Sequence, residues 1–220
     1  MAVRIVVDST ADIPRDRAST LGIEIAPLAV LFGDQAYLDG IDLDGPTFYQ
    51  KLAASTFLPT TSAPSPGIFE EAYQRAIAAG ATAILSIHLA SALSGTLQAA
   101  RTAAEVVSQR SGIPIELVDS GTVSAGFGLP AEMVAAEALQ GKGLPELKAR
   151  AESLCRRARI YAVLDTLTYL QRGGRIGRAQ AMVGTLLNVK PIIAVRDGQV
   201  VPVENVRTRG KAYERIGQLT

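Results

Sequence analysis

The feature that most constrains the fold is the alternation of short apolar runs with longer segments of helical spacing. Four apolar runs rich in branched side chains are expected to be strands, at residues 4–7, 23–32, 83–89 and 115–118. Helices are expected between or after them, at residues 47–54, 66–79, 96–108 and 129–140. Strands that alternate with helices in this way are typical of a parallel sheet with helices on both faces. We therefore expect the first part of the chain to be an α/β domain.

Local signals support these boundaries. The helix at 66–79 has Ser65 at its N-cap, Pro66 in its first turn and Gly80 just after its end, which are favoured positions for these residue types. The turn at residues 33–35 should fold the run at 23–32 back onto a short strand at 36–38.

The pattern changes after Gly141. Further elements are expected as helices at 145–158, 180–187 and 211–219, and as strands at 161–164, 191–195 and 200–206. Asp197 and Gly198 between the last two strands are a strong hairpin signal. We expect residues 1–158 to form the α/β domain and residues 159–220 to begin a smaller α+β domain. Since the last helix has no stop signal before Thr220, we expect this second domain to be incomplete.

Composition excludes several classes of function. The 220 residues carry a net charge of +1, and no apolar run approaches the roughly 18–20 residues that cross a bilayer. One Cys and one His provide neither a disulfide framework nor an ordinary zinc site. Aromatic residues make up only 5% and Trp is absent, so platforms for stacking nucleic acid bases are not expected. We expect a cytoplasmic protein with no metal, no cofactor, no nucleic acid partner and no stable membrane insertion.

Hydroxyl-rich turns indicate an anion-binding site. There are four such turns, and each follows an apolar run or precedes a helix. The first contains Ser9 and Thr10, the second Thr60, Thr61, Ser62 and Ser65, the third Ser94 and Thr96, and the fourth Ser120 and Thr122. Hydroxyls and the unpaired N–H groups at a helix N-terminus bind anions, and the helix dipole is positive there. The sequence therefore predicts a pocket for a negatively charged head group, although ordinary helix capping explains the same residues.

Two further motifs bear on this pocket. Gly95 follows Ser94 in a strand-to-helix turn, where the absence of a Cβ atom lets a ligand approach the backbone. Arg175 lies in a glycine-rich turn at residues 172–178, where an arginine can bind a carboxylate or a phosphate through two hydrogen bonds. A solvated basic turn is the simpler explanation of the same residues.

Two enzymatic functions are alternatives to a binding function. Ser9, Ser94 and the Arg175 turn would suit a phosphotransferase, but there is no Walker A lysine motif. A hydrolase would have to pair Ser94 with His88, the only histidine, which lies in an apolar run and is better explained as a core residue. Asp39, Asp42 and Asp44 lack the spacing of a calcium loop and are expected to be turn residues, and Cys155 is expected to be structural.

Taken together, the motifs resemble those of the DegV family. They occur in order along the chain, as Asp8-Ser9-Thr10-Ala11-Asp12, Tyr37-Leu38-Asp39-Gly40-Ile41-Asp42, Thr61-Ser62-Ala63-Pro64-Ser65, Leu93-Ser94-Gly95-Thr96, Val118-Asp119-Ser120, Arg172-Gly173-Gly174-Arg175-Ile176-Gly177, Lys190-Pro191-Ile192 and Arg207-Thr208-Arg209. Each motif is weak by itself, and the ordered set is specific.

The resemblance implies a function. Proteins of this family are bacterial two-domain α/β proteins that hold one long-chain fatty acid between their domains, and some present it to a separate kinase that makes acyl phosphate. It implies that Thr61 and Ser94 bind the carboxylate, with Ser62, Gly95 and Arg175 nearby, and that the chain is a carrier and not an enzyme. Two departures stand out: Ala63 replaces a longer polar residue, and the family's late histidine near the carboxylate has no counterpart among these residues.

Overall fold

The computed structural model describes residues 2–183 and 189–219. Its central feature is a four-stranded parallel sheet in the order β2-β1-β6-β7. The strands are β1 (Val3–Asp8), β2 (Ile23–Ala26), β6 (Ala83–His88) and β7 (Ile115–Asp119). β1 and β6 are neighbours in the middle of the sheet, paired from Val3 opposite Ala83 to Val7 opposite Ile87. Both central strands are buried along nearly their whole length, as expected of strands covered by helices on each side.

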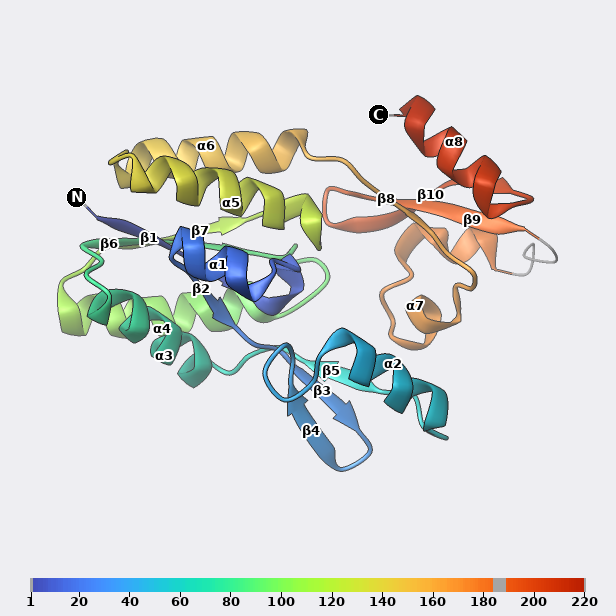
Figure 1. Ribbon diagram of the computed structural model, residues 1–220, viewed down its shortest axis with the longest axis horizontal. Helices are drawn as coiled ribbons and strands as arrows, with labels where there is room; N and C mark the ends of the chain where they lie inside the picture. Colours follow the sequence, from blue (N-terminus) through green and yellow to red (C-terminus); the bar gives the residue numbers. More distant parts are fainter. Residues whose placement is uncertain (1, 184–188, 220) are drawn as a thin grey trace.

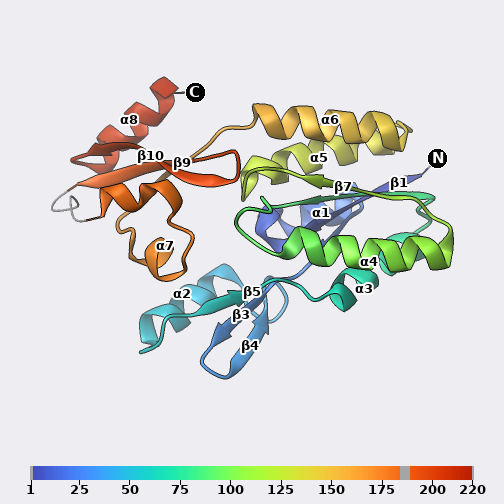
Figure 2. The same ribbon diagram turned by 180° about the vertical axis from the view of Figure 1, so that it is seen from behind.

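Helices cover both faces of this sheet, as Figures 1 and 2 show. One face packs against α1 (Arg15–Leu21), α5 (Ala125–Leu139) and α6 (Leu144–Arg157), and the other against α3 (Pro66–Ala78) and α4 (Thr96–Ser111). Phe127 and Leu147 lie in the first core, Phe69 and Tyr73 in the second, and all four are fully buried. The α/β architecture expected from the sequence is confirmed.

A second, antiparallel sheet corrects two expectations. It consists of β3 (Ala29–Phe32), β4 (Gln35–Leu38) and β5 (Thr60–Ser62), with α2 (Gly45–Ala54) beside it. Residues 23–32, expected as one strand, are divided at Pro27, which has no N–H to donate, so that β2 and β3 belong to different sheets. Residues 60–62, expected as a turn, form β5, because they pair with β3.

The residues after α6 build a third sheet. β8 (Ile160–Val163), β9 (Lys190–Arg196) and β10 (Gln199–Val206) are antiparallel, in the order β10-β9-β8. The expected hairpin is confirmed: Asp197 and Gly198 both have positive φ, 50° and 70°. The sheet is accompanied by α7 (Thr168–Arg172), the 3₁₀ helix η2 (Gly177–Met182) and α8 (Arg209–Leu219). We call residues 159–219 the C-terminal unit and residues 2–158 the N-terminal unit.

Some helix boundaries differ from those expected. The helix expected at 180–187 is replaced in its first part by η2, and the rest lies outside the described residues, apart from Val183, which follows the last residue of η2. α5 begins at Ala125, four residues before the expected start, although Gly126, Gly128 and Pro130 all disfavour a helix there. At Gly128 an added Cβ would lie 2.1 Å from the carbonyl oxygen of Ala11, so the glycine is required by close packing. In the described residues we find no helix both long and apolar enough to span a bilayer.

Candidate functional site

The carboxyl ends of the parallel strands form the candidate site. The chain leaves β1 for β2 on one side and β6 for β7 on the other, so the order of strands reverses between β1 and β6. Ligands of such sheets bind beyond the carboxyl ends of the strands at this switch point. The hydroxyl-rich turns after β1, β6 and β7 all lie at this edge, and Asp8, His88 and Asp119 end the three strands.

The turn after β1 is the short 3₁₀ helix η1 (Ser9–Ala11). Asp8 caps it: its Oδ1 accepts hydrogen bonds from the Thr10 N–H, at 3.1 Å, and from the Thr10 hydroxyl. Ser9 Oγ accepts the N–H of Leu28 at 3.1 Å, which ties this turn to the segment between β2 and β3. The Ser9 hydroxyl is therefore used in part by the fold.

The turn after β6 holds Ser94 at the entrance of α4. Ser94 Oγ accepts the N–H of Thr96 at 3.3 Å and lies 2.8 Å from Thr96 Oγ1. Thr96 is fully buried, whereas Ser94 is half-buried and Gly95 is exposed. An added Cβ at Gly95 would meet no atom within 4 Å, so the backbone is open to an approaching group.

Arg175 reaches this turn from the C-terminal unit. Its Nε donates to the carbonyl oxygen of Leu93 at 3.3 Å, and its Nη1 donates to the carbonyl oxygen of Gly173 at 2.6 Å. Gly174 between them has a φ of 72°, which favours glycine, and lets the turn bend back on itself. The structure thus brings together two segments that the sequence singled out about 80 residues apart, at Ser94 and at Arg175.

Thr61 lies in strand β5 and not at a helix entrance. It pairs with Val30 and is exposed. It lines a cavity of about 280 Å³ whose other residues are mainly apolar, namely Val30, Asp39, Leu43, Asp44, Gly45, Phe48, Tyr49 and Pro59. Neither Ser94 nor Arg175 lines this cavity. The hydroxyl of Ser62 donates to the carbonyl oxygen of Ala63 at 3.2 Å.

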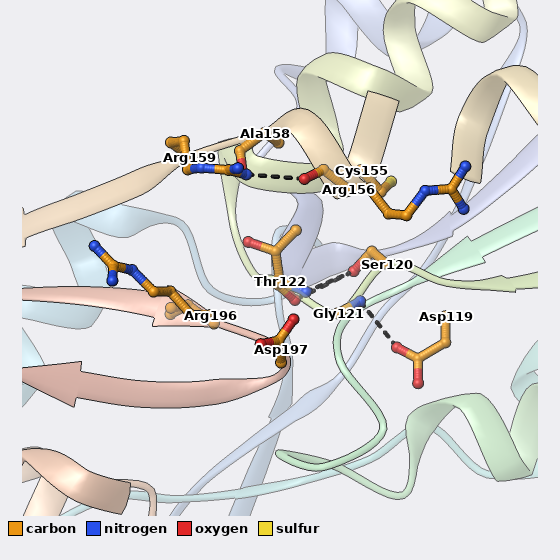
Figure 3. A pocket seen from close by; sticks show the side chains of 11 residues that line it. Asp119, Ser120, Gly121, Thr122, Cys155, Arg156, Ala158, Arg159, Arg196 and Asp197 are labelled. Atoms are coloured by element: carbon orange, nitrogen blue, oxygen red, sulfur yellow. Dashed lines mark hydrogen bonds between the residues drawn. The ribbon is translucent and has the colours of Figure 1, made fainter. Parts of the chain in front are cut away.

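A second cavity, of about 630 Å³, lies where the two units meet. Figure 3 shows the residues that line it, which come from the turn after β7, from the end of α6 and from β9 with its hairpin turn. They are Asp119, Ser120, Gly121, Thr122, Cys155, Arg156, Ala158, Arg159, Val195, Arg196 and Asp197. A fatty acid held between the units, as the family resemblance implies, needs an apolar cavity, whereas this lining is mainly polar.

Direct contacts hold the units together around this cavity. The N–H of Gly198, at the tip of the β9–β10 hairpin, donates to the carbonyl oxygen of Gly121 at 2.8 Å. Cys155 is buried at the wall, and this burial raises the pKa of its thiol to about 11. A thiol with so little thiolate at neutral pH is a poor nucleophile, which agrees with the structural role expected for it.

His88 lies in the core, as expected from the sequence. Its ring is fully buried, with Nδ1 3.0 Å from Asp8 Oδ2 and Nε2 2.7 Å from Ser86 Oγ. Both ring nitrogens are thus occupied by other partners, and the Ser94–His88 pair of a hydrolase is not formed. The sequence did not predict this contact between Asp8 and His88, which are the last residues of the paired strands β1 and β6.

The aspartates after β4 serve turns, as expected. Asp42 Oδ2 accepts the N–H of Leu38 at 2.9 Å, and Asp44 Oδ1 accepts the N–H of Thr47 at 2.8 Å at the start of α2. The Thr47 side chain, and after it this backbone N–H, lowers the pKa of Asp44 by hydrogen bonding to its carboxylate. Among residues 2–183 and 189–219 there is no group of three or more His, Cys, Asp or Glu side chains placed to hold a metal ion.

These features define a doubly wound α/β protein whose hydroxyl-bearing turns gather at the switch point, with an arginine supplied by a second unit. A family model described as an uncharacterised protein of the DegV family matches residues 2–220. The chain is 39% identical over 224 residues to a DegV domain-containing protein of Halalkalibacterium halodurans, an alignment that covers 99% of this chain and 76% of that protein. The chain belongs to the DegV family.

Solved structures agree with this assignment. A structure described as fatty acid binding of a DegV family protein from Thermus thermophilus matches with a TM-score of 0.88 and 34% identity, over 100% of this chain and 76% of that one. DegV of Bacillus subtilis, described as a fatty acid binding protein, matches with a TM-score of 0.87 and 35% identity, over 100% of this chain and 77% of that one.

Proposed function

We propose that this protein binds a long-chain fatty acid between its two units, which we take to be domains divided near residue 158. The observation that carries the proposal is the match of the whole chain to structures of fatty-acid-binding DegV proteins at 34–35% identity. In this proposal the protein is a carrier in the cytoplasm and does no chemistry of its own.

The head group is assigned to Thr61, Ser94 and Arg175. Arg175 lies beside Ser94 through its hydrogen bond to Leu93, so that a cation and a hydroxyl occupy the same turn. The Thr61 hydroxyl is exposed and, within the described residues, makes no hydrogen bond. A carboxylate bound there would accept charge-assisted hydrogen bonds from Thr61, from Ser94 and from the guanidinium, and Ser62 and the Gly95 N–H are close enough in sequence to add to them.

The tail supplies most of the affinity. Removing a sixteen-carbon chain from water is favourable by about 0.8 kcal/mol per methylene, or about 11 kcal/mol in all. Association and ordering cost several kcal/mol. The polar groups therefore fix the direction of the ligand, with the carboxylate at the rim. A separate kinase could then phosphorylate the carboxylate without extracting the tail, which is the role we propose for the bound state.

A displacement assay with a fluorescent fatty acid tests the head-group assignment. The double variant Thr61→Val and Ser94→Ala should bind palmitate more weakly by about 2–4 kcal/mol, since hydrogen bonds to charged groups contribute about 1.5–3 kcal/mol each and the tail is unaffected. Thr60→Val is the matched control, because Thr60 lies in the same strand and points to its other face. Equal affinities of the double variant and the wild type would refute the assignment.

A further inference from the structure

A buried chain of polar groups crosses the core from α4 to β1. Tyr73, Ser86, His88 and Asp8 have no exposed surface. The Tyr73 hydroxyl donates to the carbonyl oxygen of Ala100 at 3.2 Å and lies 3.0 Å from Ser86 Oγ. Ser86 Oγ lies 2.7 Å from His88 Nε2, and His88 Nδ1 lies 3.0 Å from Asp8 Oδ2. The chain therefore contains four hydrogen-bond links in series.

Each link needs one proton. The hydroxyls of Tyr73 and Ser86 supply one each, and a neutral imidazole supplies one, which leaves one of the four links without a proton. An imidazolium donates from both ring nitrogens and completes the chain. Burial raises the pKa of Tyr73, so the phenol keeps the proton that this count assigns to it.

The hydrogen bonds of Asp8 also indicate that His88 is an imidazolium. Besides the His88 ring, three donors reach its carboxylate: the N–H of Leu89 at 3.1 Å, the N–H of Thr10 at 3.1 Å and the Thr10 hydroxyl. An acceptor with four donors is an ionised carboxylate. A buried carboxylate needs an opposite charge nearby, and in the described part of the chain His88 is its ion-pair partner.

We propose that His88 is a positioning residue: as an imidazolium paired with Asp8, it locks the carboxyl ends of β1 and β6 together. Because Asp8 also holds Thr10 and Leu89, the pair fixes the turn that carries Ser9 and the start of the segment that leads to Ser94. The consequence for fatty acid binding rests on the proposed function, whereas the ion pair and the locking of the two strands do not.

Nitrogen NMR tests the ion pair directly. The chain has a single histidine, so labelling with ¹⁵N-histidine reports on His88 alone. At pH 7 both ring nitrogens should carry slowly exchanging protons and have the shifts of an imidazolium. A neutral ring, with one nitrogen unprotonated, would overturn the proposal.

Amide hydrogen exchange tests the locking without any ligand. His88→Leu removes the donor to Asp8, whereas His88→Asn keeps an N–H in place of Nδ1. In His88→Leu the Thr10 and Leu89 amides should lose about tenfold or more of their protection relative to Val134 in α5, which is the loss expected for one charged hydrogen bond. His88→Asn keeps a donor but not the positive charge, so it should recover only part of this loss and stay less protected than the wild type by about threefold or more.

Unchanged protection in His88→Leu would overturn the locking. If His88→Leu does not fold, His88→Asn decides it, because wild-type protection of Thr10 and Leu89 in that variant would contradict a lock that depends on the charge of the imidazolium. A fatty acid displacement assay adds the functional arm: about tenfold weaker binding is expected for His88→Leu and a smaller loss for His88→Asn. If the wild type itself binds no fatty acid, the proposed function fails, and the two NMR results still stand or fall by themselves.

Discussion

Replacing Gly198 by alanine tests how the C-terminal unit is seated on the N-terminal unit. Gly198 has a φ of 70°, and an added Cβ would lie 3.1 Å from the Cβ of Ala92 and 3.2 Å from that of Ala90. Its N–H also donates to the carbonyl oxygen of Gly121, which lines the cavity where the two units meet. Alanine here therefore meets both backbone strain and crowding.

The magnitude follows from these two contributions. A non-glycine residue at positive φ costs about 1–2 kcal/mol, and an extra methyl group in a packed contact costs about 1–3 kcal/mol. Gly198→Ala should thus lower the free energy of unfolding by about 2–5 kcal/mol. Gly33→Ala is the matched control: it also lies in a hairpin turn, with a φ of 59°, but an added Cβ meets nothing within 4 Å. It should cost only the first 1–2 kcal/mol.

Urea denaturation followed by circular dichroism measures both losses. The difference between the two variants isolates the contact of the hairpin tip with the loop after β6. In the displacement assay, Gly198→Ala should also weaken fatty acid binding, and Gly33→Ala should not. Equal destabilisation by the two substitutions would show that the hairpin tip does not pack against Ala90 and Ala92.

Two further predictions concern single side chains. Arg175→Ala should slow acyl phosphate formation with the cognate kinase about tenfold or more, because one charged hydrogen bond is lost. Arg172→Ala, the control, removes an exposed arginine of the same turn and should leave the rate unchanged. Equal rates for the two variants in a radiolabelled-ATP assay would remove Arg175 from the site. Burial raises the pKa of Cys155 from 9.0 to about 11. The neutral thiol therefore stabilises the folded state below pH 9, and this stability is lost as the pH rises through about 11. A plot of the urea midpoint against pH should fall less steeply over this range in Cys155→Ala than in the wild type, and identical slopes would contradict the burial of the thiol.

Much of the fold could be predicted from local signals. Apolar runs, helical spacing and the Asp197-Gly198 turn located β1, β6, β7, α3, α4 and the β9–β10 hairpin, because each of these elements has its own pattern. The run at 23–32 was wrong as one strand, since both halves are apolar and only Pro27 marks the change of sheet. Helix α1 was missed, since it has seven residues and only Ala18 and Leu21 are buried.

In the candidate site, too, local sequence patterns identified some features and not others. Ser94 and Arg175 were selected by their own residue types, and the structure brings their segments together. Thr61 was expected at a helix entrance but lies in β5, because strand pairing with β3 depends on residues thirty positions away. The contact between Asp8 and His88 likewise depends on the order of strands, which no local pattern specifies.

Native mass spectrometry of the protein purified from a bacterial host is the most direct test of fatty acid binding. Fatty acid binding predicts a population whose mass exceeds that of the chain by one long-chain fatty acid, and a shift of this population toward the apo mass in the Thr61→Val and Ser94→Ala double variant. A wild-type protein that carries no lipid, and that takes up none when palmitate is added, would contradict it.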